Sequence, residues 1–203
     1  GWVGHIPFAY WLIASTKPAN IVELGTHGGV SYFSFCDSVI DNQTGSKVFA
    51  VDTWKGDSQT GKYGEKVFDQ VNDYNATRYG EFSKLLRMKF DDAACLFDDN
   101  SIELLHIDGC HSYEAVKHDF KIWQPKLANN SIVLFHDTHQ DTPGFGVKRF
   151  WRELKKQHHA RCFEFNHCGG LGILIHSQND SHKKLQQSFA SSFKLASRLF
   201  SIC

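Results

Sequence analysis

The chain has 203 residues, enough for one domain to bury a sizeable hydrophobic core. Its 22 lysine and arginine residues equal its 22 aspartate and glutamate residues, so the basic excess typical of nucleic-acid-binding proteins is missing and we expect no nucleic-acid partner. No apolar run approaches the roughly 20 residues that cross a bilayer, and the six cysteines form no Cys-x-x-Cys pair, so we expect a cytoplasmic protein with no membrane span and reduced thiols.

Short apolar runs alternate with longer amphipathic stretches, a pattern typical of strand–helix–strand units around a mostly parallel sheet. An aromatic-rich segment at 5–15 predicts a first helix, which either packs on the sheet or covers a ligand. The predicted strands are 21–24, 47–51, 85–90, 102–107, 132–135, 162–166 and 171–176. The predicted helices are 30–40, 63–77, 91–97, 112–127 and 146–158. The fold class is therefore α/β, with a Rossmann-like doubly wound sheet of seven strands.

The end of the chain departs from this alternation. Only residues 167–169 separate the last two strands, so we expect them to form an antiparallel hairpin. Residues 1–177 then make one domain that includes the N-terminal helix. Within 178–203 an apolar stripe predicts either a docking amphipathic helix or a connector to a fused partner domain; its residues are Leu185, Phe189, Phe193, Leu195 and Leu199.

A glycine-rich turn follows the first strand, from Glu23 to Ser31, and leads into a helix. Such a turn lets a ligand approach the backbone and the positive helix N-terminus. The second strand ends in Asp52, where a carboxylate can accept hydrogen bonds from both hydroxyls of a ribose. Together these features predict a nucleoside ligand. His27 stands where Gly-x-Gly-x-x-Gly requires its second glycine, which argues against NAD.

Several further motifs make a resemblance specific. They are Glu-Leu-Gly-x-x-x-Gly-x-Ser at 23–31, Asp-Thr-Trp at 52–54, His-Ile-Asp-Gly-x-His-x-Tyr at 106–113, the positions Asp119, Trp123 and Leu127, and Phe-His-Asp-Thr at 135–138. Over residues 2–176 the chain resembles class I S-adenosylmethionine-dependent methyltransferases of the cephalosporin-hydroxylase and macrocin O-methyltransferase-like group.

The resemblance implies the places of the cofactor-binding residues. Glu23, Gly25 and Gly29 would line the methionine part of S-adenosylmethionine, with Thr26 and Ser31 in the same turn. Asp52 would bind the ribose, and Asp91, after the third strand, would lie near the adenine. Trp54 either stacks on a ring of the cofactor or packs inside the protein.

Acidic and imidazole side chains follow the next two strands. Asp108 and His111 come after the fourth strand, and His136, Asp137 and His139 come at or after the end of the fifth. Neighbouring parallel strands bring these ends together beside the cofactor crevice, so we expect Asp108, His111, His136 and Asp137 to be catalytic.

Methyl transfer to oxygen requires removal of the acceptor's proton, by a histidine or with the help of a metal. Asp108, His136 and Asp137 are the predicted metal ligands, with His111 as an alternative imidazole. The resemblance suggests magnesium, whereas imidazole favours zinc, iron or manganese.

The favoured function is O-methylation of a small hydroxylated acceptor, such as a sugar or a polysaccharide precursor, with or without a metal. A second hypothesis is a metal-dependent oxygenase or hydrolase that uses His111, His136, Asp137 and His139. A third is a cofactor-binding module that serves as a scaffold. A homo-oligomer is compatible with each of them.

Overall fold

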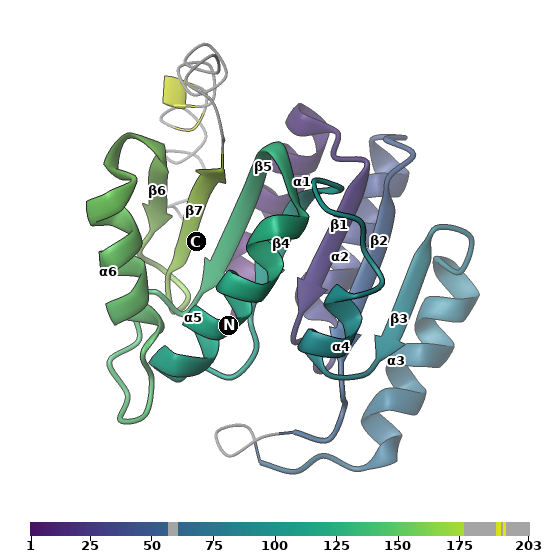
Figure 1. The fold of residues 1–203 in the computed structure, drawn as a ribbon. Helices are drawn as coiled ribbons and strands as arrows, with labels where there is room; N and C mark the ends of the chain where they lie inside the picture. Colours follow the sequence, from purple (N-terminus) through teal and green to yellow (C-terminus); the bar gives the residue numbers. More distant parts are fainter. Residues whose placement is uncertain (57–60, 177–189, 192, 194–203) are drawn as a thin grey trace.

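The computed structural model describes residues 1–56, 61–176, 190, 191 and 193, and it shows helices on both faces of a central sheet (Figure 1). The strands are β1 (Asn20–Leu24), β2 (Lys47–Asp52), β3 (Ser83–Arg87), β4 (Ile102–Ile107), β5 (Leu127–His136), β6 (Cys162–Phe165) and β7 (Leu171–His176). The α-helices are α1 (Ile6–Thr16), α2 (Val30–Asp41), α3 (Glu65–Arg78), α4 (Phe90–Ala94), α5 (Tyr113–Trp123) and α6 (Val147–Gln157). Three short 3-10 helices are η1 (Trp2–His5), η2 (Gln124–Lys126) and η3 (His159–Arg161).

The seven strands form one sheet in the order β3-β2-β1-β4-β5-β7-β6. The first five strands pair in parallel, and β7 is antiparallel to both β5 and β6. The predicted mostly parallel sheet with a C-terminal hairpin is therefore confirmed. The chain runs outward from β1 to β3 and then returns to place β4 on the other side of β1. Such a reversal opens a crevice at the carboxyl ends of β1 and β4.

Each face of the sheet has its own hydrophobic core, because side chains alternate between the two faces along every strand. Phe8 of α1 and Phe35 of α2 belong to the cluster on one face. Phe120 and Trp123 of α5, together with Trp151 of α6, belong to the cluster on the other. In Figure 1, α1 and α2 lie behind the sheet and α4 and α5 lie in front of it.

Two of the predicted strand boundaries were wrong. β5 begins at Leu127 instead of 132, because Leu127 pairs with Ile102 across an irregularity in the ladder. The preceding helix, α5, ends at Trp123 instead of 127. β3 covers Ser83–Arg87 instead of 85–90, and the helix predicted at 91–97 is the shorter α4. Ser83 and Lys84 begin β3, and polar residues 129–131 interrupt β5 after its first two residues, so a search for apolar runs missed both starts.

The N-terminal segment packs on the sheet, as one of the two predicted alternatives has it. Phe8 and Leu12 of α1 have no exposed surface, and the helix packs against α2. The helix expected within 178–203 lies almost wholly outside the described residues. The ring of Phe193, which is described, lies 5.1 Å from that of Phe163 and 5.0 Å from that of Phe165.

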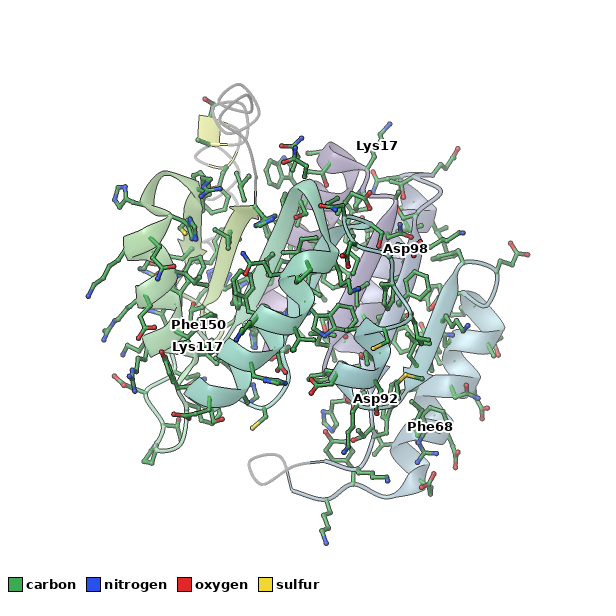
Figure 2. All side chains as sticks on the ribbon, viewed as in Figure 1. Lys17, Phe68, Asp92, Asp98, Lys117 and Phe150 are labelled. Atoms are coloured by element: carbon green, nitrogen blue, oxygen red, sulfur yellow. The ribbon has the colours of Figure 1, made fainter. Side chains whose placement is uncertain are left out.

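The carboxyl ends of the parallel strands share the lower edge of the sheet in Figure 1. Figure 2 places Phe68 and Asp92 at this edge, and Lys17 and Asp98 at the opposite one. The residues that the sequence predicts to be functional follow the strand ends at the lower edge. The topology therefore brings the predicted cofactor turn and the predicted reactive residues to one side of the molecule.

Candidate active site

The turn after β1 has a backbone shape that favours glycine. Gly25 has a φ of 87°, and its N–H donates to the carbonyl of Val51 at 2.9 Å. A Cβ atom at Gly25 would collide with the carbonyl oxygen of Asp108. The turns after β1 and β4 are therefore in direct contact, so a ligand in the glycine turn lies beside Asp108.

Asp52, the last residue of β2, organises this turn. Its Oδ2 accepts the backbone N–H groups of Thr26 at 3.0 Å and His27 at 2.9 Å. Its Oδ1 accepts the N–H of Trp54 at 2.7 Å. A carboxylate offers about four acceptor positions, so these three bonds leave roughly one for a ligand. Asp52 thus both shapes the cofactor turn and keeps capacity to bind a hydroxyl.

A pocket of about 360 Å³ opens beside Asp52, within the size range of small-molecule sites. The ends of four strands and the segments that follow them contribute to its wall, together with α5. The residues are Gly25 and His27 after β1; Asp52 at the end of β2, with Thr53, Gly56 and Tyr63 after it; Lys89 after β3, with Phe90 and Asp91 of α4; Asp108, Gly109, Cys110 and His111 after β4; and His118 and Asp119 of α5. Three predicted cofactor residues, Gly25, Asp52 and Asp91, lie in this wall. The pocket also includes two predicted catalytic residues, Asp108 and His111.

The other predicted cofactor residues lie behind the wall. Trp54 is 1% exposed, its indole donates to the carbonyl of His27 at 2.9 Å, and its ring packs against Phe68. Of the two alternatives for Trp54, stacking on the cofactor or packing inside the protein, the structure shows packing. Thr26, Ser31 and Gly29 are buried in the turn, where Gly29 has a φ of 83° and begins α2. They shape the turn without lining the pocket.

Glu23 takes part in a buried network on the α1 side of the sheet. Its Oε2 lies 2.8 Å from Nδ1 of His106, and Nε2 of His106 accepts the indole N–H of Trp2 at 3.1 Å. Glu23 and His106 have no exposed surface. Glu23 is therefore separated from the pocket, and in this structure its contact is with the N-terminal segment.

The predicted catalytic residues form one cluster. Nε2 of His111 lies 3.4 Å from Oδ1 of Asp108 and 3.1 Å from Oδ2 of Asp137. Nδ1 of His136 lies 3.3 Å from Oδ1 of Asp108 and 3.5 Å from Oδ1 of Asp137. The ring of Phe145 stacks on His111 at 4.6 Å between ring centres. Two carboxylates thus meet two imidazoles, as the strand order predicts.

The charges in the cluster stabilise one another. Burial opposes ionisation of Asp108, but the charge of His136 and hydrogen bonds from both imidazoles hold its pKa well below the usual value. Burial also opposes ionisation of Asp137, but hydrogen bonds from His111 and His136 lower its pKa to about 2. Burial would lower the pKa of each imidazole, but the two carboxylates raise it to about 9 for His111 and about 10 for His136.

His136 uses both ring nitrogens within the protein. Nε2 lies 3.1 Å from the carbonyl oxygen of Cys168, which can only accept, so this nitrogen carries a hydrogen. Nδ1 faces the carboxylates of Asp108 and Asp137 and also carries one. An imidazole protonated at both nitrogens has no lone pair for a metal. His136 therefore acts as a cation that holds the two carboxylates.

The remaining donors fit a divalent metal. One ligand atom each from Asp108, His111 and Asp137 lies within 4.8 Å of the others. Carboxylate oxygens with an imidazole nitrogen form a set typical of zinc, iron and manganese sites. Among the predicted ligands, the geometry thus supports Asp108 and Asp137 and favours His111 over His136, whose orientation depends on the hairpin turn at Cys168.

Two pocket residues, His118 and Asp119, were given no function in the sequence analysis, although Asp119 is one of the positions that carry the resemblance. His118 has its Nε2 3.0 Å from both carboxylate oxygens of Asp91. Asp119 is only 6% exposed although it is acidic. A signal for Asp119 was available, because it stands three positions after Val116 on the buried face of α5. No comparable signal marks His118.

The comparisons with known proteins agree with this geometry. Residues 22–138 match the model of a methyltransferase-domain family, which is more than half of the chain. The chain belongs to this family. The sequence-based assignment to the class I S-adenosylmethionine-dependent methyltransferases is confirmed. Among the described residues, no helix has the length and apolar character to cross a membrane.

A curated relative of this methyltransferase domain is the protein y4gI of Sinorhizobium fredii. It is 46% identical over 174 residues, a region that covers 86% of this chain and 19% of y4gI. The chain thus spans about a fifth of the length of this curated relative.

Solved methyltransferases share the fold. One is PaMTH1 from Podospora anserina with bound S-adenosylhomocysteine, at a TM-score of 0.62 and 13% identity, covering 83% of this chain and 76% of that one. Another is the O-methyltransferase TomG from Streptomyces achromogenes with S-adenosylmethionine, at a TM-score of 0.61 and 12% identity, covering 85% and 79%. Identities this low relate the folds alone.

Proposed function

We propose that this domain binds S-adenosylmethionine in the pocket beside Asp52 and transfers its methyl group to a hydroxyl of a small polar acceptor, such as a sugar or a polysaccharide precursor. One observation carries the proposal: Asp108 and His111 belong both to the pocket wall and to the acid–imidazole cluster. The sulfonium and the acceptor oxygen can therefore meet at one place. The cofactors named for PaMTH1 and TomG support the choice of cofactor, and the name of TomG supports transfer to oxygen.

The reaction is an in-line displacement. The acceptor oxygen bonds to the methyl carbon, the carbon–sulfur bond breaks with its electron pair moving to sulfur, and the hydroxyl proton passes to a base. In the metal-free cluster both imidazoles hold their protons at neutral pH, because their pKa values are about 9 and about 10. Neither His111 nor His136 is then free to accept the hydroxyl proton.

This protonation state favours a metal-assisted version of the reaction. Asp108, Asp137 and Nε2 of His111 would hold a divalent ion, with manganese, iron or zinc suiting the mixed donors better than magnesium. Such an ion would supply Lewis-acid chemistry that lowers the pKa of the acceptor hydroxyl, whose proton can then pass to water. His136 stays protonated and keeps both carboxylates oriented.

Calorimetric titration of the 203-residue chain with S-adenosylmethionine and S-adenosylhomocysteine tests the cofactor. We expect both to bind, and Asp52→Ala to weaken binding of both. Transfer of an isotope-labelled methyl group to a panel of nucleotide sugars then tests the acceptor class. If the wild-type chain binds neither cofactor, the proposed function is wrong.

The same assay, run with and without a chelator, tests the metal. Chelation should abolish transfer and leave binding of S-adenosylhomocysteine unchanged, and added Mn²⁺ should restore transfer. Full transfer in the chelator would contradict metal assistance. Membership of a methyltransferase family favours methyl transfer over the oxygenase or hydrolase hypothesis. Chelator-sensitive turnover without any methyl donor would reverse that preference.

A further inference from the structure

Asp119 is a buried carboxyl group that lines the pocket. It lies on α5 and is 6% exposed. Its Oδ2 lies 3.7 Å from the position that a Cβ of Gly109 would take. Within the described part of the chain, its side chain has no hydrogen-bond or ion-pair partner. Because Asp119 lines the pocket and has no such partner, its carboxyl group can meet a partner that comes from outside the chain.

The position of Asp119 in the pocket indicates which part of the cofactor it meets. The methyl group must face Asp108 and His111, where the reactive cluster lies, and the ribose belongs beside Asp52. Apart from the turns that follow β1 and β2 and residues 108–111, the wall consists of Lys89, Phe90, Asp91, His118 and Asp119. Phe90 is half-buried there and offers an aromatic face to a flat base. This part of the pocket is therefore left for the adenine.

Adenine presents an amino donor next to a ring-nitrogen acceptor. A neutral carboxylic acid offers the complement, since it has one O–H donor and one carbonyl acceptor. We propose that Asp119 binds the amino edge of the cofactor's adenine, donating its O–H to a ring nitrogen and accepting from the amino group. The inference rests on the proposed function, because it needs an adenosyl cofactor in this pocket.

The electrostatics around Asp119 support the neutral form. Burial raises its pKa to about 7, while nearby His118 lowers it and Asp91 raises it. The other ionisable groups in this part of the wall are Lys89 beside α4 and Asp108 after β4. Above pH 7 the carboxyl loses its donor hydrogen and sets a negative charge against the lone pair of the ring nitrogen. Adenine binding by Asp119 is therefore expected to weaken as the pH rises.

Two substitutions in the full chain separate recognition from a structural role. Asp119→Asn keeps one donor and one acceptor, so calorimetry should show S-adenosylhomocysteine binding within about 3-fold of wild type. Asp119→Leu removes both groups, and we expect affinity to fall about 10- to 100-fold, the equivalent of two hydrogen bonds. The thermal midpoint of the ligand-free Leu variant should be unchanged or higher, because no partner within the protein is lost.

The pH dependence provides a second readout. Wild-type affinity for S-adenosylhomocysteine should fall by roughly 10-fold between pH 6 and pH 8.5, since each pH unit above the pKa costs up to a factor of ten. The Asn variant does not titrate, so any fall that it shares with wild type comes from other groups. If wild type binds S-adenosylhomocysteine and the Leu variant binds it equally well, the role of Asp119 is overturned while the proposed function stands. An unfolded Leu variant, or identical pH profiles for wild type and Asn, would also overturn that role.

Discussion

Nε2 of His111 lies 3.1 Å from Oδ2 of Asp137, although the two residues follow different strands of the sheet. His111 comes after β4 and Asp137 after β5, and these strands are parallel neighbours. The sheet therefore fixes the separation of an imidazole and a carboxylate that are far apart in the chain. Phe145 stacks on His111 and limits the rotation of its ring. The fold thus brings the members of the cluster together.

Asp137→Asn should separate chemistry from cofactor binding. Asn is the suitable replacement, because residue 137 has a φ of 60°, which Asn tolerates better than most residues. We expect kcat to fall at least about 100-fold, on the scale of lost proton-transfer catalysis, while S-adenosylhomocysteine binds within about 3-fold of wild type. Asp141→Asn is the matched control, since Asp141 is exposed and pairs with Lys148 on the surface. Equal loss of turnover and cofactor affinity in Asp137→Asn would show that the chemistry lies elsewhere.

Gly25→Ala and Gly28→Ala form a matched pair within one turn. A Cβ at Gly25 would collide with the carbonyl of Asp108 at a φ of 87°, whereas a Cβ at Gly28 meets nothing within 4 Å. Gly25→Ala should lower the free energy of unfolding by about 1–3 kcal/mol, the cost of a strained backbone position, and weaken cofactor binding. Gly28→Ala should leave both within error of wild type. Chemical denaturation and calorimetry measure the two effects, and similar behaviour of the two variants would contradict the close contact between the turns.

The strand-end residues could be predicted from the sequence because their position depends on local pattern and general topology. The glycine turn, Asp52, Asp108 and Asp137 all follow apolar runs, and parallel strands bring such ends together. Which imidazole has a nitrogen oriented toward the proposed metal site could not be predicted in this way. The orientation of His136 is set by the carbonyl of Cys168, a contact across 32 positions that no local pattern encodes.

Glu23 shows the same limit more clearly. Its motif resembles a cofactor turn, yet its partner His106 bonds to Trp2, 104 positions away. That partner sits in the N-terminal segment, whose packing the sequence left open. The sequence also did not predict the start of β5, because polar residues such as Asn129 and Asn130 follow its first two residues. Contacts between residues far apart in the chain, and not local composition, determine both the surroundings of Glu23 and the start of β5.

Metal binding should be linked to proton release. In the metal-free cluster His111 holds its proton up to a pKa of about 9, and a metal must displace it. The Mn²⁺ affinity should therefore increase with pH between 6 and 9, by up to about tenfold per unit. Calorimetry in buffers of different ionisation enthalpy measures the released protons. Mn²⁺ affinity that does not change over this range would contradict a metal on His111.

His111 and Asp137 also determine how the free energy of unfolding of the metal-free protein depends on pH. The pKa of His111 is raised from 6.5 to about 9, so its contribution to stability is complete below pH 6.5 and is lost as the pH rises through 9. The pKa of Asp137 is lowered from 3.8 to about 2, so its contribution is present above pH 3.8 and is lost as the pH falls through 2. Denaturation in chelator should show less loss of stability towards pH 9 in His111→Gln than in wild type.

Glu23→Leu tests whether Glu23 binds cofactor or supports the fold. The substitution leaves Nδ1 of His106 without its partner in a site that has no exposed surface. Losing one partner of a buried hydrogen bond costs about 1–3 kcal/mol of unfolding free energy, which denaturant titration can measure. S-adenosylhomocysteine affinity should stay within about 3-fold of wild type, because Glu23 does not line the pocket. The double variant Glu23→Leu with His106→Leu should regain only part of the loss, since it removes both members of the Glu23–His106 pair but leaves the indole N–H of Trp2 without its acceptor. A large fall in cofactor affinity with unchanged stability would instead return Glu23 to the role that its motif predicts.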